Sequence, residues 1–259
     1  MPKFAANLST LFTEYPFLER FSAAADVGFK AVEYLFPYEF PPSTIARHLT
    51  QNGLTQALFN FPAGNWEAGD RGLAALPQRK REFHSSIAIA MEYAAVTHVK
   101  RLHVMSGLAR SDDAEAARSY RENVAYAADS CARHGVDVLI EPINGRDMPG
   151  YFLGNFQAAA SLIRELGRPN LKLQFDIYHR QILHGDVLTA LVEFFPIIGH
   201  IQIASVPNRN EPNTGELNDD HILAELDRLG YSGYVGCEYR PAGRTAEGLK
   251  WIRRWAQDG

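Results

Sequence analysis

The stretch LKLQFDIYH, residues Leu171 to His179, begins as an alternating apolar run with strand character and ends in two polar side chains, Asp176 and His179. Charged groups are rarely buried unless they are paired or bound to a metal, so a carboxylate at the end of an apolar strand needs a partner. Two interpretations are open. Asp176 either caps the turn that follows the strand, or it is a metal ligand that faces similar residues on other strands. For this stretch alone, the structural interpretation is the simpler one.

The rest of the chain repeats the same unit, because apolar runs alternate with helical patterns from one end to the other. Strands are expected at residues 3–7, 31–36, 55–60, 101–107, 137–143, from 171 onward, 198–205 and 234–239. Helices are expected at residues 14–26, from 41–43 to just before 53, 77–97, from a cap at Ser111, Asp112 and Glu115 to 133, 155–166, 187–195, 219–229 and 245–256.

Eight strand–helix units of roughly 32 residues each are the expected size for a (β/α)₈ barrel. No G-x-G-x-x-G motif follows the first strand, which argues against a doubly wound dinucleotide-binding sheet. No Pro/Ser-rich linker or shift in composition divides the chain. The sequence therefore predicts an α/β protein with a single TIM barrel domain over residues 1–259.

Composition excludes several classes of partner. The net charge of −4 argues against nucleic acid, whose binding proteins usually carry a basic excess. No stretch approaches the run of about 18 apolar residues that spans a membrane, and the N-terminus lacks the apolar core of a signal peptide. The two cysteines, Cys131 and Cys237, suit a reducing compartment. A cytoplasmic protein is expected, and a homo-oligomer is left open.

Four consecutive strand ends carry polar groups that hydrocarbon packing would not select: Glu141, Asp176, Gln202 and Glu238. In a barrel of this kind the chemistry lies at the carboxyl ends of the strands. Adjacent strands are about 4.8 Å apart, so these side chains can converge, and carboxylates that close repel unless a cation lies between them. An all-oxygen donor set favours Mg²⁺ or Mn²⁺, whereas zinc more often recruits His or Cys. Each residue alone has a structural explanation; the four together favour a metal site.

Further polar residues at strand ends and in the following loops are expected to contact the substrate, and these are His179, Arg209, Asn7, Asn60 and Arg71. Arg71 and Arg209 are the best candidates for an anionic group, since a guanidinium pairs with a carboxylate in a bidentate fork. A solvated side chain is the simpler interpretation for Arg71. The loop at residues 61–72 is long, and long loops in compact domains are often functional.

The chain also resembles the hydroxypyruvate isomerase family, within the xylose isomerase-like barrels, over nearly its whole length. The matching stretches are FAANLS (residues 4–9), FPY (36–38), AGDRG (68–72), EPIN (141–144), DIYH (176–179), HIQIA (200–204), EPNTGE (211–216) and GCEY (236–239). The resemblance implies a divalent metal ion, Mg²⁺ or Mn²⁺, at Glu141, Asp176, Gln202 and Glu238. It also implies that Glu141 and Glu238 transfer protons.

The reaction implied by this resemblance interconverts hydroxypyruvate and tartronate semialdehyde, small hydroxy-oxo acids, through a cis-enediolate. Other stretches, FAANLS with FTEYPFLERF (residues 12–21) and HVMSG (103–107), are similar to the 2-oxo-tetronate isomerase branch, so that substrate stays open. A ketose 3-epimerase is a further alternative with the same two glutamates. A nuclease-type barrel predicts more metal-binding histidines and a basic face, and a non-catalytic binding protein predicts the loss of one glutamate.

Overall fold

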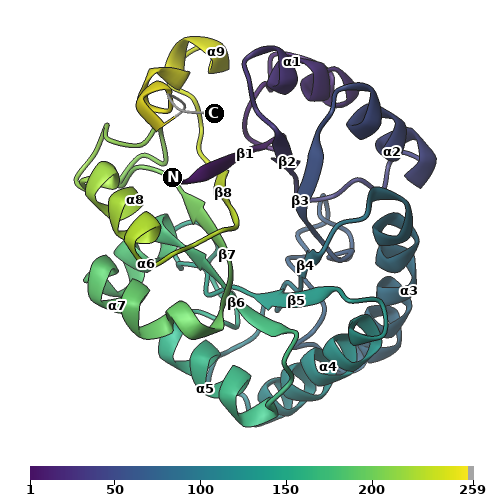
Figure 1. The fold of residues 1–259 in the computed structure, drawn as a ribbon. Coiled ribbons are helices and arrows are strands. Elements are labelled where there is room, and N and C mark those ends of the chain that lie inside the picture. Colours follow the sequence, from purple (N-terminus) through teal and green to yellow (C-terminus); the bar gives the residue numbers. More distant parts are fainter. Residues whose placement is uncertain (256–259) are drawn as a thin grey trace.

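The computed structural model describes residues 1–255, and eight strands in this range close into a barrel in chain order (Figure 1). The strands are β1 (Lys3–Asn7), β2 (Ala31–Glu33), β3 (Thr55–Asn60), β4 (Arg101–His103), β5 (Asp137–Ile140), β6 (Leu171–Asp176), β7 (Ile198–Ile203) and β8 (Tyr234–Cys237). Every neighbouring pair is parallel, including β1 with β8, which completes the circle. The predicted (β/α)₈ barrel is confirmed.

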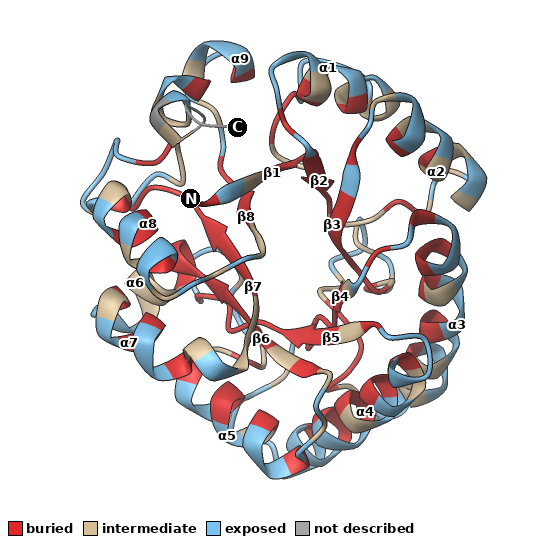
Figure 2. Cartoon of the chain, in the orientation of Figure 1, coloured by how far each residue is buried: buried red, intermediate tan, exposed pale blue. Residues whose placement is uncertain are grey.

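Helices form a ring around this barrel. They are α1 (Arg20–Asp26), α2 (Pro42–Gln51), α3 (Lys80–Thr97), α4 (Ala114–Ala132), α5 (Phe156–Leu166), α6 (Ile177–His184), α7 (Val187–Phe194), α8 (Asp219–Arg228) and α9 (Thr245–Gly248). In Figure 2 the strands are mostly buried, and the helices are buried on the side that faces the barrel and exposed on the other. Within residues 1–255, no helix is both long enough and apolar enough to cross a membrane.

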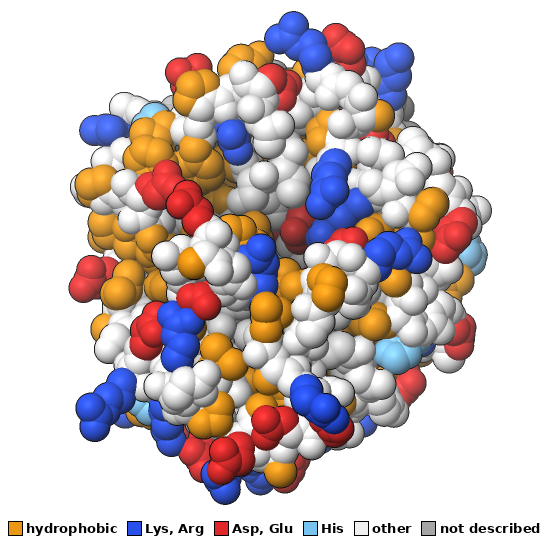
Figure 3. All heavy atoms as spheres, turned by 180° about the vertical axis from the view of Figure 1, so that it is seen from behind, with side chains coloured by type: hydrophobic (Ala, Val, Ile, Leu, Met, Phe, Trp, Pro, Cys, Tyr) orange, Lys and Arg blue, Asp and Glu red, His pale blue; other side chains and the backbone are white. Residues whose placement is uncertain are grey.

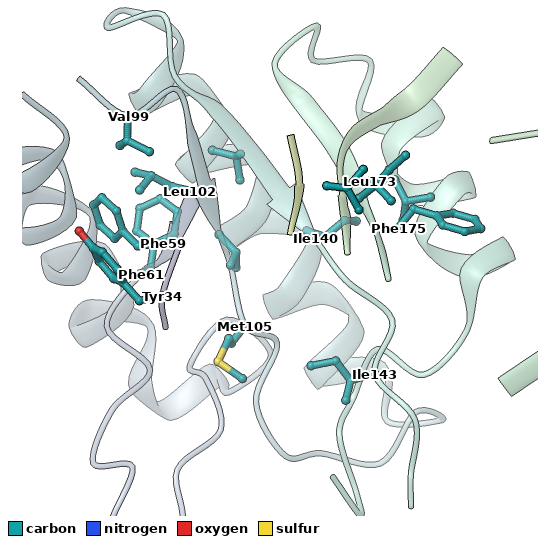
Figure 4. Packing of buried hydrophobic residues seen from close by; sticks show 14 of the residues in the cluster. Tyr34, Phe59, Phe61, Val99, Leu102, Met105, Ile140, Ile143, Leu173 and Phe175 are labelled. Carbon is teal, nitrogen blue, oxygen red and sulfur yellow. The ribbon is translucent and has the colours of Figure 1, made fainter. Parts of the chain in front are cut away.

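Apolar packing outside the strands fixes where the helices lie. Phe175 of β6 points outward and its ring centroid lies 5.3 Å from that of Phe156, the first residue of α5. On the other side of the barrel, Tyr34, Phe59 and Phe61 form an aromatic group, seen on the left of Figure 4. Such buried aromatic side chains supply a large share of the apolar area that stabilises a domain.

Several strands end earlier than the sequence predicts. The expected strand at residues 101–107 ends at His103, and those at 31–36, 137–143, 198–205 and 234–239 end at Glu33, Ile140, Ile203 and Cys237. The apolar residues beyond these ends are buried in loops instead: Val104 and Met105 have almost no exposed surface although they lie outside β4. Burial at the barrel rim therefore produces the same apolar pattern as a strand, which is why the sequence pattern extends the strands too far.

The helix boundaries also need correction. Residues 14–16 are not helical, since Pro16 has extended backbone angles, and a 3₁₀ turn at Phe17–Glu19 precedes α1. The cap of α4 is Asp113, whose side chain accepts the backbone N–H groups of the next turn, in place of the expected Ser111, Asp112 and Glu115. Helix α6 is an addition to the expected elements.

At the C-terminus, α9 ends at Gly248 and is followed by the 3₁₀ turns Leu249–Trp251 and Arg253–Trp255, so the long helix expected at residues 245–256 is wrong within the described range. Its last expected residue, Ala256, and the end of the expected domain at Gly259 lie outside the described residues.

Candidate active site

A cavity of about 260 Å³ lies at the carboxyl ends of the strands. Its lining includes Asn7, Glu33, Asn60, Trp66, Arg71, His103, Met105, Glu141, Ile143, Asp147, Gln174, His179, Gln202, Arg209, Glu238 and Arg240. Figure 3 views the molecule from the side opposite to Figure 1 and shows a hollow near the centre of the face, with acidic and basic side chains beside it. Met105 and Ile143, both labelled in Figure 4, lie in the loops after β4 and β5 and form part of its apolar wall.

Asp176, the last residue of β6, caps the turn that follows the strand, as one of the two interpretations of the sequence expects. Its Oδ1 accepts the backbone N–H groups of Tyr178 (2.7 Å) and His179 (3.3 Å), and so caps α6. Its Oδ2 faces the other way, 3.6 Å from Nε2 of His179 and 3.5 Å from the guanidinium of Arg209. One oxygen holds the helix start, and the other faces His179 and Arg209, which both line the cavity.

The carboxylate of Glu141, one residue beyond β5, completes the buried group. Ligand atoms of Glu141, Asp176 and His179 all lie within 4.8 Å of one another, and all three side chains are buried. Oε1 of Glu141 has no hydrogen-bond partner among the described residues, although it is buried. A buried carboxylate oxygen without a partner is costly, so this atom indicates a group that the protein alone does not supply.

Among the described residues, Arg209 is the arginine that pairs with these acids. Its guanidinium lies 3.1 Å from Oε1 of Glu238, 3.5 Å from Oδ2 of Asp176 and 3.3 Å from Oδ2 of Asp147, and it stacks 4.9 Å from the ring centre of Tyr178. Its backbone has φ of +58°, an uncommon conformation for a residue with a Cβ. Strained backbone of this kind clusters at functional sites.

Electrostatics favours protons on the acids of this site when no other cation is near. Burial raises the pKa of Glu141 well above its usual range, and the carboxylates of Asp176 and Glu238 raise it further. Burial also raises the pKa of Glu238, to about 8, although Arg209 acts against it. The pKa of Asp176 is raised by burial too, while Arg209 and the two capping N–H groups oppose the shift. One arginine therefore does not balance these three acids.

The donor atoms fit a hard divalent cation. Glu141 and Glu238 line the cavity, and a carboxylate oxygen of Asp176 lies within 4.8 Å of Glu141; such oxygens are the ligands that Mg²⁺ and Mn²⁺ prefer. A cation there would also meet the unpartnered oxygen of Glu141. Gln202, the fourth expected ligand, lies in register with Asp176 on the neighbouring strand and lines the same cavity. Its amide oxygen accepts a hydrogen bond from Gln174 at 2.6 Å.

The residues expected to contact substrate all line the cavity, but their side chains are not equally available. Asn7 donates to Glu33 at 3.0 Å and accepts from the N–H of Ser9 at 3.0 Å, so both ends of its amide are engaged. Asn60 has its amide oxygen 3.3 Å from Nδ1 of His103.

Arg71 is ordered by its own loop. One guanidinium nitrogen donates to the carbonyl oxygens of Trp66 (3.0 Å) and Asp70 (2.7 Å), and the guanidinium lies 4.1 Å from the centre of the Trp66 ring. Trp66 in turn packs on Phe36. This arrangement differs from a freely solvated arginine, the simpler interpretation from sequence, and leaves the remaining N–H groups of the fork for another partner.

Four further polar residues of the site were not predicted from the sequence: Glu33, Gln174 and Asp147 line the cavity, and Asn144 is buried in the loop after β5. Glu33 is the clearest case, because it ends β2 and is fully buried with three side-chain donors around it. The strand-end rule that selected the residues on β5 to β8 would also have selected Glu33 if the second strand had been ended correctly. Asn144 stands within the EPIN stretch, where only Glu141 was assigned a role.

A parallel eight-stranded barrel with acidic side chains around a cavity at its carboxyl end is the architecture of a (β/α)₈ enzyme. Residues 21–255 match the family model described as xylose isomerase-like TIM barrel, and the chain belongs to this family. Within it, the chain is 53% identical to a 2-oxo-tetronate isomerase from Cupriavidus necator, over 98% of both chains. It is 41% identical to the hydroxypyruvate isomerase of Escherichia coli, over 97% of this chain and 98% of the relative.

Among solved structures, an AP endonuclease, family 2, from Brucella melitensis superposes with a TM-score of 0.96 and 48% identity, covering 98% of this chain and 99% of that one. The similarity to the two named isomerases and the shared fold identify the protein as an enzyme of the isomerase class, with a small molecule as its substrate. The predicted resemblance to the hydroxypyruvate isomerase family is confirmed.

Proposed function

We propose that this enzyme is a metal-dependent isomerase that converts 2-oxo-tetronate into its 3-oxo isomer. The observation that carries the proposal is a group of three buried carboxylates at the cavity. Glu141 and Glu238 line it, ligand atoms of Asp176 and Glu141 lie within 4.8 Å of each other, and Arg209 pairs with Asp176 and Glu238. The relative of higher identity is named for this substrate, which favours it over hydroxypyruvate, the first substrate implied by the family resemblance. Hydroxypyruvate is the second candidate, supported by the name of the Escherichia coli relative.

The size of the cavity supports a small acid. Its volume of about 260 Å³ lies below the range of roughly 300–1,000 Å³ that is common for pockets that bind drug-sized ligands. An acid of three or four carbons suits such a volume better than a free ketohexose does. The cavity therefore favours the isomerase over a ketose 3-epimerase.

The reaction is a balanced internal transfer. A proton leaves the carbon that bears the hydroxyl group, the neighbouring carbonyl carbon gains a proton, and the hydroxyl proton passes to the former carbonyl oxygen. The enediol between these two states carries oxygens on adjacent carbons in a cis arrangement. No redox cofactor is consumed, since one carbon is oxidised as its neighbour is reduced.

The surroundings of the two glutamates divide the proton transfers between them. Glu238 lies 3.1 Å from the guanidinium of Arg209, which favours its ionised form, so we assign it as the base that removes the proton from carbon. Glu141 is buried beside two other acids and makes no ion pair with Arg209, so it holds its proton more strongly. It is assigned as the acid that protonates the neighbouring carbon. Two carboxyl groups whose pKa values are made different by their surroundings are a recurring acid–base arrangement in enzymes.

A divalent cation bound by Glu141, Asp176, Gln202 and Glu238 would polarise the two substrate oxygens and offset the negative charge of the site. The chain itself orients the substrate. Arg71 offers the rest of its guanidinium fork to the substrate carboxylate from the rim, and Trp66 fixes that fork by stacking. Met105 and Ile143 exclude water from one side of the cavity.

The proposal is tested by turnover in ²H₂O. Purified enzyme with added Mg²⁺ or Mn²⁺ is supplied separately with 2-oxo-tetronate and with hydroxypyruvate, and kcat/KM is compared. Isomerisation with deuterium in the product or exchanged into the substrate is expected, with the higher kcat/KM on 2-oxo-tetronate. A higher kcat/KM on hydroxypyruvate would reverse the order of the two substrates. Absence of turnover on both would refute the proposed function.

A further inference from the structure

We propose that Asn144 is a positioning residue that fixes the proton of His179 on Nε2, so that the imidazole presents an N–H donor to an oxygen of the substrate. The nature of that oxygen rests on the proposed function. The position of the proton does not, because it follows from hydrogen bonds within the protein.

The first step is the orientation of the Asn144 amide. This side chain is fully buried in the loop after β5. One end of the amide accepts the backbone N–H groups of Arg146 (3.0 Å) and Asp147 (2.9 Å). Backbone N–H groups can only donate, so that end must be the oxygen, which removes the usual ambiguity between oxygen and nitrogen. The amide nitrogen therefore faces His179.

The second step is the tautomer of His179. Its Nδ1 lies 2.6 Å from the amide nitrogen of Asn144 and 3.3 Å from the backbone nitrogen of the same residue. Both of these groups are donors, so Nδ1 must supply a lone pair and carries no proton. A ring whose Nδ1 carries no proton is neutral, because the charged imidazolium has a proton on both nitrogens. A neutral imidazole has one proton, which then lies on Nε2.

The third step is what this proton faces. Nε2 of His179 is 3.6 Å from Oδ2 of Asp176, and the side chain lines the cavity. A nitrogen that carries a proton cannot offer its lone pair to a metal ion. His179 is therefore a hydrogen-bond donor to an acceptor oxygen that enters the cavity, even though its ring lies close enough to Glu141 and Asp176 to be counted with them as a ligand. A donor there stabilises negative charge that develops on a substrate oxygen.

The inference is tested first on the wild-type protein by NMR. Two-bond ¹H–¹⁵N correlation spectra of uniformly ¹⁵N-labelled, metal-free enzyme report which nitrogen of each neutral histidine carries the proton. The signals of His179 are assigned by their loss in His179→Gln. We expect the Nε2–H tautomer, and an Nδ1–H tautomer or a charged ring at pH 8 would overturn the inference without reference to activity or metal.

The variant Asn144→Asp then tests the positioning role, because a carboxylate oxygen facing Nδ1 can only accept. We expect a proton on Nδ1 and a kcat/KM lowered by about 10- to 100-fold, the loss typical of a hydrogen bond to a charged or charge-developing group. The matched control is Asn155→Asp, at the N-cap of α5, where either side chain accepts the N–H of Ala158. This control should leave tautomer and kcat/KM unchanged.

The outcomes separate the two proposals. An unchanged tautomer and unchanged kinetic constants in Asn144→Asp would refute the positioning role. If Asn144→Asp does not fold, the wild-type spectrum still decides the tautomer. Asn144→Ala, which removes only the side-chain donor, then decides the positioning role. Loss of the single Nε2–H form would support that role, and its retention would refute it. Failure of the enzyme to turn over either acid, with the Nε2–H tautomer present, would refute the proposed function alone.

Discussion

The amide nitrogen of Gln202 lies 2.7 Å from Oε1 of Glu33, in a hydrogen bond that is buried in the centre of the barrel. Glu33 also accepts from Asn7 at 3.0 Å, and Nε2 of His200 lies 2.6 Å from its second oxygen. Because a carboxylate can only accept, the nitrogen of Gln202 must face Glu33. The oxygen of Gln202 is thereby directed away from Glu33, to the side where Gln174 donates to it.

The first prediction concerns this orientation. Glu33→Gln removes an acceptor that three donors share, and we expect the amide of Gln202 to rotate and turn its nitrogen toward the expected metal site. The Kd for Mn²⁺, measured by isothermal titration calorimetry at pH 7.5, should increase by about 10- to 100-fold, as for other groups that orient metal ligands. In the double variant Glu33→Gln with Gln202→Glu, the amide at position 33 can donate to the carboxylate at position 202. This variant should recover part of the affinity for Mn²⁺.

A control for this experiment is Asp219→Asn, which makes the same change from carboxylate to amide at a buried residue outside the cavity lining. It should leave the Kd for Mn²⁺ unchanged. An unaltered Kd in Glu33→Gln would show that Glu33 only satisfies buried donors.

The second prediction uses the space that Glu33 occupies. A Cβ at Gly236 of β8 would lie 2.3 Å from Oε1 and 2.4 Å from Oε2 of Glu33. Gly236→Ala should therefore lower the free energy of unfolding by about 1–3 kcal/mol, the usual range for overpacking. The matched control is Gly243→Ala, where a Cβ would meet no atom within 4 Å and which should stay within about 0.5 kcal/mol of wild type. Urea denaturation measures both, and equal losses would contradict the close packing.

These two residues also mark the limit of what the sequence predicts. The barrel follows from the repetition of strand and helix, and the four polar residues at consecutive strand ends follow from the same repeat. Glu33 was not predicted as a site residue because Tyr34, Leu35 and Phe36 continue the apolar run beyond it. This pattern places the carboxylate inside a strand and not at its end. When an apolar loop follows a strand at the rim, the sequence pattern does not show which inward-facing residue is the last of that strand.

Side-chain hydrogen bonds between residues that are far apart in the chain could not be predicted from the sequence, for a different reason. The EPIN stretch itself does not indicate that the side chain of Asn144 contacts His179, which is 35 residues further along the chain. The same holds for Gln202 and Glu33, which are 169 residues apart. Residue types at strand ends predict which groups gather at the site, but which group donates and which accepts depends on side-chain orientation.

A third prediction separates the two glutamates. We expect Glu141→Gln and Glu238→Gln each to lower kcat by about 10²- to 10⁴-fold, the usual contribution of a positioned acid or base. Glu238→Gln, which removes the assigned base, should also abolish deuterium exchange into the substrate, whereas Glu141→Gln should retain it. ¹H NMR of either acid in ²H₂O follows both quantities. If Glu238→Gln retained deuterium exchange and Glu141→Gln lost it, Glu141 would be the base and Glu238 the acid.

The fourth prediction tests Arg71 as the contact for the substrate carboxylate. Lysine keeps the charge but cannot form two parallel hydrogen bonds or stack in the same way on Trp66, so Arg71→Lys should raise KM by about tenfold while kcat changes little. Arg110→Lys is the matched control, because Arg110 is exposed and pairs with Asp112 away from the cavity. Steady-state kinetics on both acids provides the measurement. A fall in kcat at unchanged KM would place Arg71 in the chemical step instead.

The fifth prediction concerns Asp219, the first residue of α8, which is buried and has one carboxylate oxygen without a partner among the described residues. Burial raises its pKa from 3.8 to about 6, although the N–H of Asn213 opposes the shift. The folded state therefore binds this proton more strongly than the unfolded state does. The stability that the protonated form contributes is fully present below pH 3.8 and is lost as pH rises through about 6.

Asparagine does not titrate, so the stability of Asp219→Asn relative to wild type should rise between pH 4 and pH 7. At 1.36 kcal/mol per pKa unit, the gain is at most about 3 kcal/mol. Urea denaturation of both proteins across this range measures the difference. Asp129→Asn is a control of opposite sign, because a hydrogen bond from Arg168 lowers the pKa of that exposed carboxyl and its small contribution is lost as pH falls. A difference for Asp219→Asn that does not change with pH would mean that Asp219 has no raised pKa in the folded enzyme.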